Sequence, residues 1–358
     1  MGLHGEMRYL GVDNSVQKRS DPRLILPECK SILILATRYP KSEHPMSLKR
    51  ALPTVTAGLG DNSFKQWHGL IHGKIAAYAW GDDYHDILVR RLRYLSDFIQ
   101  EKNSNSIPHR YYTDTGPILE RDLAQRAGLG WIGKNTCLIN PQFGSYFFLA
   151  EILLGIDLEV DQPFLYDRCG SCTRCLQACP TQCILPDRTL DACRCISYLT
   201  IESKGAIPTH LRAMMGDWVF GCDICQQVCP WNRFADNNVN PEFKPRSDLP
   251  EPSLNREMTL TQEDFSQKFK NSPVKRARRS GYLRNVAIAL GNSKDPVAVP
   301  VLRTALLTDP EPQVRAHAAW ALSELGFPES IMALTEARSI EQDRYVISEI
   351  DSASARVY

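Results

Sequence analysis

Cysteine spacing is the feature that most limits what this chain can fold into. Ten of its twelve cysteines lie between Cys169 and Cys229. The first run, from Cys169 to Pro180, is spaced Cys-x2-Cys-x2-Cys-x3-Cys-Pro, which is typical of 4Fe–4S clusters. A second run, Cys-x2-Cys-x3-Cys-Pro from Cys222 to Pro230, ends in the same way. Together the two runs predict two clusters, each able to carry a single electron.

The last cysteine of each run is expected to bind the neighbouring cluster, because the fourth cysteine of such a run ligates the other cubane. One cluster should therefore take Cys169, Cys172, Cys175 and Cys229. The other should take Cys179, Cys222, Cys225 and one of Cys183, Cys193 or Cys195. Zinc sites or structural thiols are weaker explanations, because neither accounts for the two cysteine–proline endings.

Composition bounds the class of protein. The 358 residues predict two or three domains, and 43% hydrophobic content is enough for a real core. No apolar run approaches the roughly 18 residues of a membrane span. The polar start, Met1 to Asn14, has no apolar core of a signal peptide. We therefore expect a cytoplasmic protein, where reduced cysteines bind metal or perform redox chemistry.

The first half of the chain alternates apolar runs with helical patterns. Helical spacing of leucine and isoleucine predicts a helix over Asp86–Glu101. The predicted strands are Ser31–Tyr39, Lys74–Trp80, Thr136–Ile139 and Tyr146–Leu154. Strands alternating with helices indicate an α/β layer with a mixed or parallel sheet.

The second half ends in a repeated helical pattern. A polar, proline-bearing connector, Asn232–Asn255, follows the cysteine-rich segment. Arg284–Gly291 and Arg315–Leu322 are then related alanine-rich segments, which resemble a short HEAT-type solenoid. Two repeats cannot bury a core alone, so this part should dock on the preceding domain. The predicted divisions are residues 1–165 (α/β), 166–231 (clusters), 232–281 (linker and basic segment) and 282–358 (helical repeats).

A block of positive charge lies between these parts. Phe265 to Lys294 contains eight Lys or Arg and no Asp or Glu, in a chain of net charge +1. Such asymmetry favours a phosphate-binding surface for RNA over an ordinary solvated helix face, where charges are usually mixed. His317 and Trp320 could extend this surface, although Trp320 fits a core position equally well. The predicted RNA contacts are Lys275, Arg276, Arg278, Arg279, Arg284, Asn285 and Arg315.

Several short strings resemble the epoxyqueuosine reductase family of tRNA-modifying enzymes, relatives of corrinoid iron–sulfur dehalogenases. The resemblance extends from about Arg8 to beyond Leu325. Its strings are Tyr78–His85 (YAWGDDYH), Asp114–Pro117 (DTGP), Gly133–Thr136 (GKNT), Phe143–Ser145 (FGS), Arg194–Glu202 (RCISYLTIE), Gly221–Cys225 (GCDIC) and Arg284-Asn285.

The resemblance implies a fold and a reaction. The fold is an α/β cobalamin-binding domain, a ferredoxin-like two-cluster domain and C-terminal α-helical HEAT-like repeats. The reaction is the two-electron reduction of the epoxide of epoxyqueuosine, at the tRNA wobble position, to the alkene of queuosine. The cofactors are cobalamin and the two 4Fe–4S clusters. Cobalamin rests on the resemblance alone, because the chain has no Asp-x-His-x-x-Gly corrinoid motif.

The resemblance also implies residue roles. It selects Cys195 as the eighth cluster ligand and Asp114 as the proton donor to the leaving oxygen. From the residues alone, Asp114 reads more readily as a helix-entry residue, with Thr115 capping a helix that starts near Pro117. Lys134 and His85 are also compatible with purely structural roles. The implied cobalamin contacts are Arg19, Ala76, Asp114, Leu138, Leu149 and Gly221.

Two departures and two rival functions accompany this interpretation. The chain begins where relatives already have an opening helix and strand, and Ala77 stands where many relatives carry a polar residue.

One rival function is that of a corrinoid reductive dehalogenase acting on a small molecule, which has no need of the basic block. The other is an electron carrier, which has no need of residues 1–165. We expect a monomer that receives electrons from a one-electron donor such as flavodoxin or ferredoxin.

Overall fold

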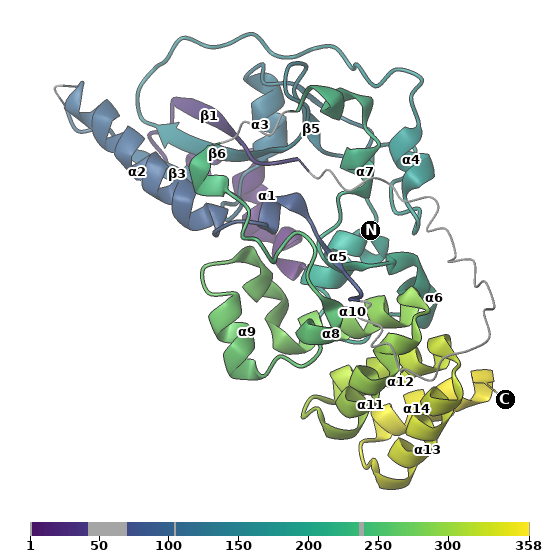
Figure 1. The fold of residues 1–358 in the computed structure, drawn as a ribbon. Coiled ribbons are helices and arrows are strands. Elements are labelled where there is room, and N and C mark those ends of the chain that lie inside the picture. Colours follow the sequence, from purple (N-terminus) through teal and green to yellow (C-terminus); the bar gives the residue numbers. More distant parts are fainter. Residues whose placement is uncertain (1, 42–69, 104, 236–239, 358) are drawn as a thin grey trace.

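The structure is a computed structural model that describes residues 2–41, 70–103, 105–235 and 240–357. A three-stranded sheet is the centre of the first half of the chain (Figure 1). The strands are β1 (Ser31–Arg38), β3 (His109–Tyr112) and β6 (Phe147–Leu154), with β6 in the centre. Both pairings are antiparallel. The prediction of a mixed or parallel sheet was therefore wrong for these strands. The alternation of strands with helices, which suggested a mixed or parallel sheet, arises here because helices cover both faces of an antiparallel sheet.

The two faces of the sheet carry different helices. Ala150, Ile152 and Leu154 of β6 pack with Leu92 of α2 (Tyr84–Glu101). The alternate β6 residues Phe147 and Leu153 lie on the opposite face, in the apolar clusters that include Ala124 of α3 (Glu120–Arg126) and Ile118 just before it. This alternation follows from the two-residue period of a strand.

Two predicted strands are shorter than expected. The segment Lys74–Trp80 is extended only in β2 (Lys74–Ile75), which pairs in parallel with β7 (Trp218–Phe220), and then forms a 3-10 turn. The Trp80 indole N–H donates to the Ile75 carbonyl at 2.7 Å and so connects the end of this turn to β2. The strand expected from Thr136 begins at Leu138, since the positive φ of Thr136, 63°, belongs to the hairpin turn. That hairpin joins β4 (Trp131–Ile132) to β5 (Leu138–Ile139).

The cysteine-rich segment consists of short helices and loops. Helix α4 (Arg174–Ala178) from the first cysteine run packs against α7 (Ile224–Gln227) from the second. Between the runs lie α5 (Ile196–Ile201) and α6 (Thr209–Arg212). The N-terminal segment contributes α1 (Asp13–Ser20). This arrangement brings the two cysteine runs together, although they are far apart in sequence.

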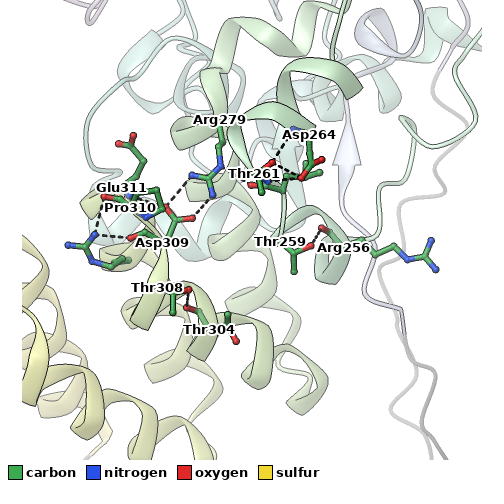
Figure 2. A network of polar contacts seen from close by, with 12 residues as sticks. Arg256, Thr259, Thr261, Asp264, Arg279, Thr304, Thr308, Asp309, Pro310 and Glu311 are labelled. Atoms are coloured by element: carbon green, nitrogen blue, oxygen red, sulfur yellow. Dashed lines mark hydrogen bonds and ion pairs between the residues drawn. The ribbon is translucent and has the colours of Figure 1, made fainter.

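The predicted connector is fixed to the rest of the protein by buried apolar side chains and a backbone hydrogen bond. Phe243 and Leu249 are buried, and the Arg246 backbone N–H donates to the Trp80 carbonyl at 2.8 Å. Residues 236–239 of the connector lie outside the described residues. The short helices α8 (Leu254–Glu257) and α9 (Gln262–Lys268) follow. Helix α9 starts with a capping box in which Thr261 and Asp264 exchange hydrogen bonds (Figure 2).

The C-terminal part is a stack of helices that docks on the rest of the chain, as predicted. It begins at residue 278 rather than 282. Its helices are α10 (Arg278–Ser293), α11 (Val299–Thr308), α12 (Pro312–Leu325), α13 (Pro328–Ile340) and α14 (Arg344–Val357). Helix α10 contacts β7 and α5 on one side and α12 on the other. The largest apolar core runs from the β2 region to α14, so the predicted divisions share one core.

Candidate active site and cluster-binding segment

The thiols expected to bind the first cluster lie near one another. The described cysteines form no disulfides, so all of them are free thiols. Burial raises the pKa of the Cys229 thiol, and Cys169 and Cys175 raise it further through their charges. Cys229 is therefore close to two cysteines of the other run. This proximity is what the crossover assignment requires.

The second group includes more thiols than a cluster needs, since Cys137 also lies beside Cys225. Burial raises the pKa of Cys222, and the charges of Cys195 and Cys179 add to this effect. Cys183 is buried with its sulfur 3.4 Å from that of Cys179. Cys193 is exposed and its thiol faces the Gly2 carbonyl at 3.8 Å. Cys183 and Cys195 thus both lie in this group, and the choice of Cys195 remains a prediction.

A hairpin of the α/β domain holds the first cysteine loop. Lys134, between β4 and β5, donates its ammonium to the carbonyls of Gly170 at 2.7 Å and Cys172 at 3.0 Å. The Trp131 indole N–H donates to the Cys169 sulfur at 3.4 Å. Lys134 is therefore more than a solvated loop lysine. It links the sheet domain to the loop that carries three predicted ligands.

Asp114 lies in a strained turn directly after β3. Its φ is +56°, and the Thr115 N–H donates to the Thr113 carbonyl at 2.7 Å across it. A non-glycine residue in this region costs about 1 to 3 kcal/mol and persists only where its surroundings hold it. The alternative role as a helix-entry residue does not fit, because α3 starts at Glu120 and its N-cap is Leu119.

Three groups hold this turn in place. The Tyr84 hydroxyl donates to Asp114 Oδ2 at 2.7 Å, and the Glu120 carboxylate accepts the Asp114 backbone N–H at 2.5 Å. The Thr113 hydroxyl donates to the Leu149 carbonyl at 2.8 Å. The Asp114 side chain itself is 65% exposed. A carboxyl that is fixed yet accessible can exchange a proton with a bound molecule.

His85 lies beside this carboxyl. Its Nε2 is 3.8 Å from Asp114 Oδ2, and its Nδ1 is 2.7 Å from the carboxylate of Asp83, the N-cap residue of α2. Burial lowers the pKa of His85, but Asp83 and Asp114 together outweigh burial and raise it. His85 thus combines a structural contact with a position at the site.

Sequence reasoning missed several residues here. It assigned no role to Tyr84, although Tyr84 stands within the Tyr78–His85 string. It also missed Glu120 and Glu151, which no motif marks. Asp223 is a further omission, inside the Gly221–Cys225 string. It is buried, accepts the Ala77 N–H at 2.7 Å, and burial raises its pKa to about 7.

The residues expected to contact cobalamin differ in accessibility. Asp114 is exposed, and Arg19 and Leu149 are half-buried. Ala76, Leu138 and Gly221 are buried, and a Cβ placed on Gly221 would meet that of Ala76 at 2.5 Å. Arg19, Asp114 and Leu149 offer a cation, a carboxyl and an apolar side chain, which fit the amide rim and apolar ring of a corrinoid. The buried three would need their surroundings to open, and all six contacts remain predictions.

Four of the predicted RNA contacts need correction. Arg284 is 0% exposed and donates to the carbonyls of Leu199, Ser203 and Gly205 at 2.7 to 2.8 Å. Asn285 is also buried, and it donates to the Thr200 carbonyl at 2.9 Å. These polar groups lie within the protein and leave no surface for RNA.

Arg279 and Arg315 are the other two. Figure 2 shows Arg279 directed at Asp309, with which it forms a buried ion pair at 2.6 Å. Half-buried Arg315 pairs with Glu341 at 2.7 Å. Their charge is already neutralised. Charge alone does not separate such residues from surface cations. His317 and Trp320 are also buried, so they do not extend the surface.

The other three predicted RNA contacts remain exposed at the start of α10. Lys275, Arg276 and Arg278 are accessible, and Arg276 pairs with Glu202 at 2.7 Å. The hydrogen bond to Glu202 raises the pKa of Arg276, and the charge of Asp114 adds a smaller contribution. No helix in the described ranges is long and apolar enough to cross a membrane.

Paired cysteine runs, a fixed exposed carboxyl and a docked helical stack define an iron–sulfur oxidoreductase. Three family models match the chain, described as epoxyqueuosine reductase QueG, DUF1730 (residues 19–115), a 4Fe-4S double cluster binding domain (168–232) and HEAT repeats (278–354). An epoxyqueuosine reductase of Xanthomonas campestris is 38% identical over 328 residues, which cover 91% of this chain and 86% of that protein. That of Bacillus subtilis is 35% identical over 336 residues, covering 94% and 82%. The chain belongs to the epoxyqueuosine reductase family, and it is an enzyme of the oxidoreductase class.

Solved structures agree with this assignment. An epoxyqueuosine reductase with an epoxyqueuosine-modified tRNA stem loop matches with a TM-score of 0.83 and 34% identity, covering 95% of this chain and 85% of that one. The Bacillus subtilis enzyme with its catalytic loop swung out of the active site matches with a TM-score of 0.82 and 34% identity, covering 96% and 86%. Neither rival function, the dehalogenase or the electron carrier, is favoured by these relatives.

Proposed function

We propose that this protein reduces the epoxide of epoxyqueuosine in tRNA to the alkene of queuosine, with Asp114 as the proton donor. The reaction consumes two electrons and two protons and releases the epoxide oxygen as water. The observation that carries the proposal is the Asp114 carboxyl, accessible yet fixed in a strained turn, in a chain of this family.

The electron supply rests on the two cysteine groups. The cluster ligands are proposed to be Cys169, Cys172, Cys175 and Cys229 for one cluster, and Cys179, Cys195, Cys222 and Cys225 for the other. Bound clusters would supply single electrons, and bound cobalamin would supply the two-electron reduction of the epoxide carbon. Arg19, Asp114 and Leu149 would hold the corrinoid on its accessible side. We infer a one-electron donor of the flavodoxin or ferredoxin kind.

The residues around Asp114 serve proton transfer. The leaving oxygen must be protonated, because an alkoxide is a poor leaving group where water is excluded. Tyr84 occupies Asp114 Oδ2, so Oδ1 is the oxygen that can hold and deliver a proton. The tRNA would lie across Lys275, Arg276 and Arg278, whose charges attract phosphates. We infer that the protein acts as a cytoplasmic monomer, where its thiols stay reduced and its substrate tRNA is found.

The test uses anaerobic protein with verified clusters, added cobalamin and a strong one-electron reductant. It is incubated with tRNA bearing epoxyqueuosine, and the digested nucleosides are read by mass. Wild type should remove one oxygen mass, while Asp114→Asn should be slower by about 10² to 10⁴-fold. Asp122→Asn is the matched control, since Asp122 is a carboxylate on α3 that, among the described residues, forms its ion pair with Arg126 in its own helix.

The outcomes separate the parts of the proposal. Conversion by wild type and Asp122→Asn alone supports both substrate and acid. Equal conversion by Asp114→Asn leaves the reaction standing and removes Asp114 as the donor. No conversion by wild type with both cofactors loaded contradicts the proposed substrate.

A further inference from the structure

A buried glutamate lies on the central strand of the sheet, behind the Asp114 turn. Glu151 of β6 is 0% exposed, and within the described chain the carboxyl of Glu120 is the group placed to share a proton with its carboxyl oxygens, which have no other hydrogen-bond partner. Its neighbours on the same face of β6, Leu149 and Leu153, are apolar. A lone buried carboxylate costs so much free energy that a group of this kind normally keeps its proton.

Glu120 lies between this glutamate and Asp114. It is the first residue of α3, which packs on β6, and its carboxylate accepts the Asp114 N–H at 2.5 Å. Burial raises the pKa of Glu151, and the charges of Glu120 and Asp114 raise it further. Burial and the charge of Asp114 also raise the pKa of Glu120, to about 7, although the Asp114 N–H, the charge of Arg121 and the hydrogen bond to Glu151 each lower it. Two such carboxyls near each other cannot readily ionise together, so the pair holds a proton near neutral pH.

The turn needs such support. The segment 113–119 is anchored at its ends by buried Thr113 and Ile118. A side chain at Gly116 would collide with the Tyr112 ring at 2.5 Å, so the segment packs closely on β3. Between these anchors, Glu120 is the acceptor of the Asp114 N–H, and no other acceptor for it is found among the described residues. Loss of that acceptor would free the strained residue to relax.

We propose that Glu120, charged and sharing a proton-holding site with buried Glu151, is the positioning residue that keeps Asp114 in its strained turn. The inference rests on the proposed function only for its effect on turnover. The hold on the turn is a property of the protein without substrate. Glu120 and Glu151 themselves do not reach the substrate and act through Asp114.

The first measurement is hydrogen–deuterium exchange of the amides of 113–119 in the cluster-loaded full chain, without tRNA. Glu120→Ala should speed exchange of the Asp114 amide at least about tenfold, because its acceptor is gone. Glu120→Gln keeps a carbonyl acceptor and should restore most of the protection. Asp122→Asn, two residues along α3, should exchange like wild type. Equal exchange in Glu120→Ala and wild type would overturn the proposal, as would faster exchange throughout β6 and α10, which indicates general loss of fold.

The second measurement tests the proton. For carboxyls with raised pKa values, the stabilising protonated form is present at lower pH and is lost as pH rises through those values. Wild-type protection of the turn, corrected for intrinsic exchange, should therefore fall between about pH 7 and about pH 9, because the pKa of Glu120 is raised to about 7 and that of Glu151 to about 9. Glu151→Gln, which stays neutral, should keep its protection over that range. The same fall in both proteins would remove Glu151 from the proposal.

The third measurement is turnover with epoxyqueuosine tRNA. Glu120→Ala should lower kcat about 10 to 100-fold with KM little changed, and Glu120→Gln should recover most of it, because a displaced acid loses alignment. If wild type fails to convert the tRNA, the proposed function fails while the exchange result still decides the role of Glu120. If Glu120→Ala loosens the turn but turns over normally, the link to Asp114 catalysis is wrong.

Discussion

Asp114 and Tyr84 show how a single hydrogen bond can align a reactive carboxyl. The Tyr84 ring stacks on Phe148, with ring centroids 4.3 Å apart, so its hydroxyl is aimed by core packing. Burial raises the pKa of Tyr84, and nearby Asp114 raises it further, so the hydroxyl stays protonated and can only donate to the carboxylate. The Asp114 carboxyl is thus oriented by Tyr84, whose ring is packed in the core, while the Asp114 backbone N–H is held by Glu120 of α3.

Removal of this hydroxyl should slow the reaction without unfolding the protein. Tyr84→Phe keeps the ring stack but loses one hydrogen bond, worth about 0.5 to 1.5 kcal/mol, so kcat should fall about two- to tenfold. Tyr94→Phe on the same helix, with Tyr94 78% exposed, should have no effect. Single-turnover rates measure both. In the Asp114→Asn background Tyr84→Phe should add nothing, and an additive loss would argue against an action through Asp114.

Helix α10 has both buried and exposed arginines, although in the sequence they belong to one basic block. Arg284 faces inward to carbonyls around α5, and burial lowers its pKa to about 10. Arg278, six residues earlier, is exposed at the start of the helix. One helix thus carries a buried cation that holds the helical stack to the cysteine-rich segment and an exposed cation that is a proposed phosphate contact.

The two arginines should respond differently to substitution. Arg284→Ala removes the arginine donor from the carbonyls of buried Leu199 and Ser203 and should lower the free energy of unfolding by about 3 kcal/mol or more, measured by denaturant titration. Arg278→Ala should leave stability within about 0.5 kcal/mol but weaken tRNA binding and reduce its salt slope by about one. Equal salt slopes for Arg278→Ala and wild type would contradict the RNA surface at α10.

The molecule as a whole is joined at the cysteine-rich segment. Lys134 ties this segment to the sheet domain, and Arg284 ties it to the helical stack. The largest core crosses the same segment. The predicted cluster ligands, the Asp114 turn and the basic helix are therefore held in one packed unit, and cluster loss should affect distant parts of the molecule.

The crossover of ligands makes a prediction across that segment. Cys229→Ser should lower the iron content from about eight to about four per chain, with the remaining cluster seen by EPR. Cys229→Ser with Cys169→Ser should lose no more iron than either change alone, whereas Cys229→Ser with Cys222→Ser should lose both clusters. Cys29→Ser is the control, since Cys29 packs beside the sheet in a separate cluster of apolar residues. The reverse pattern of iron loss would show that each run serves its own cluster.

The amino-acid sequence was enough to predict the features that depend on residues close to one another along the chain. Cysteine spacing predicts two clusters because ligands a few residues apart must meet one metal group, and helical periodicity predicted α2 and the C-terminal stack. Short strings such as Asp114–Pro117 pointed to the family, which the comparisons confirmed, whereas the role of the Asp114 carboxyl stays a prediction.

The exposure of each charged side chain and the contact between the carboxyls of Glu120 and Glu151 could be seen only in the tertiary structure. Arg284 and Arg278 carry the same charge, and only the packing of α10 on α5 separates a buried anchor from a surface cation. Antiparallel pairing of β6 was equally hidden, because a strand covered on both faces is apolar whichever way its neighbours run. Glu120 and Glu151 are 31 residues apart and carry no motif. They meet behind Asp114 because α3 packs across β6, and long-range contact of this kind leaves no local pattern in the chain.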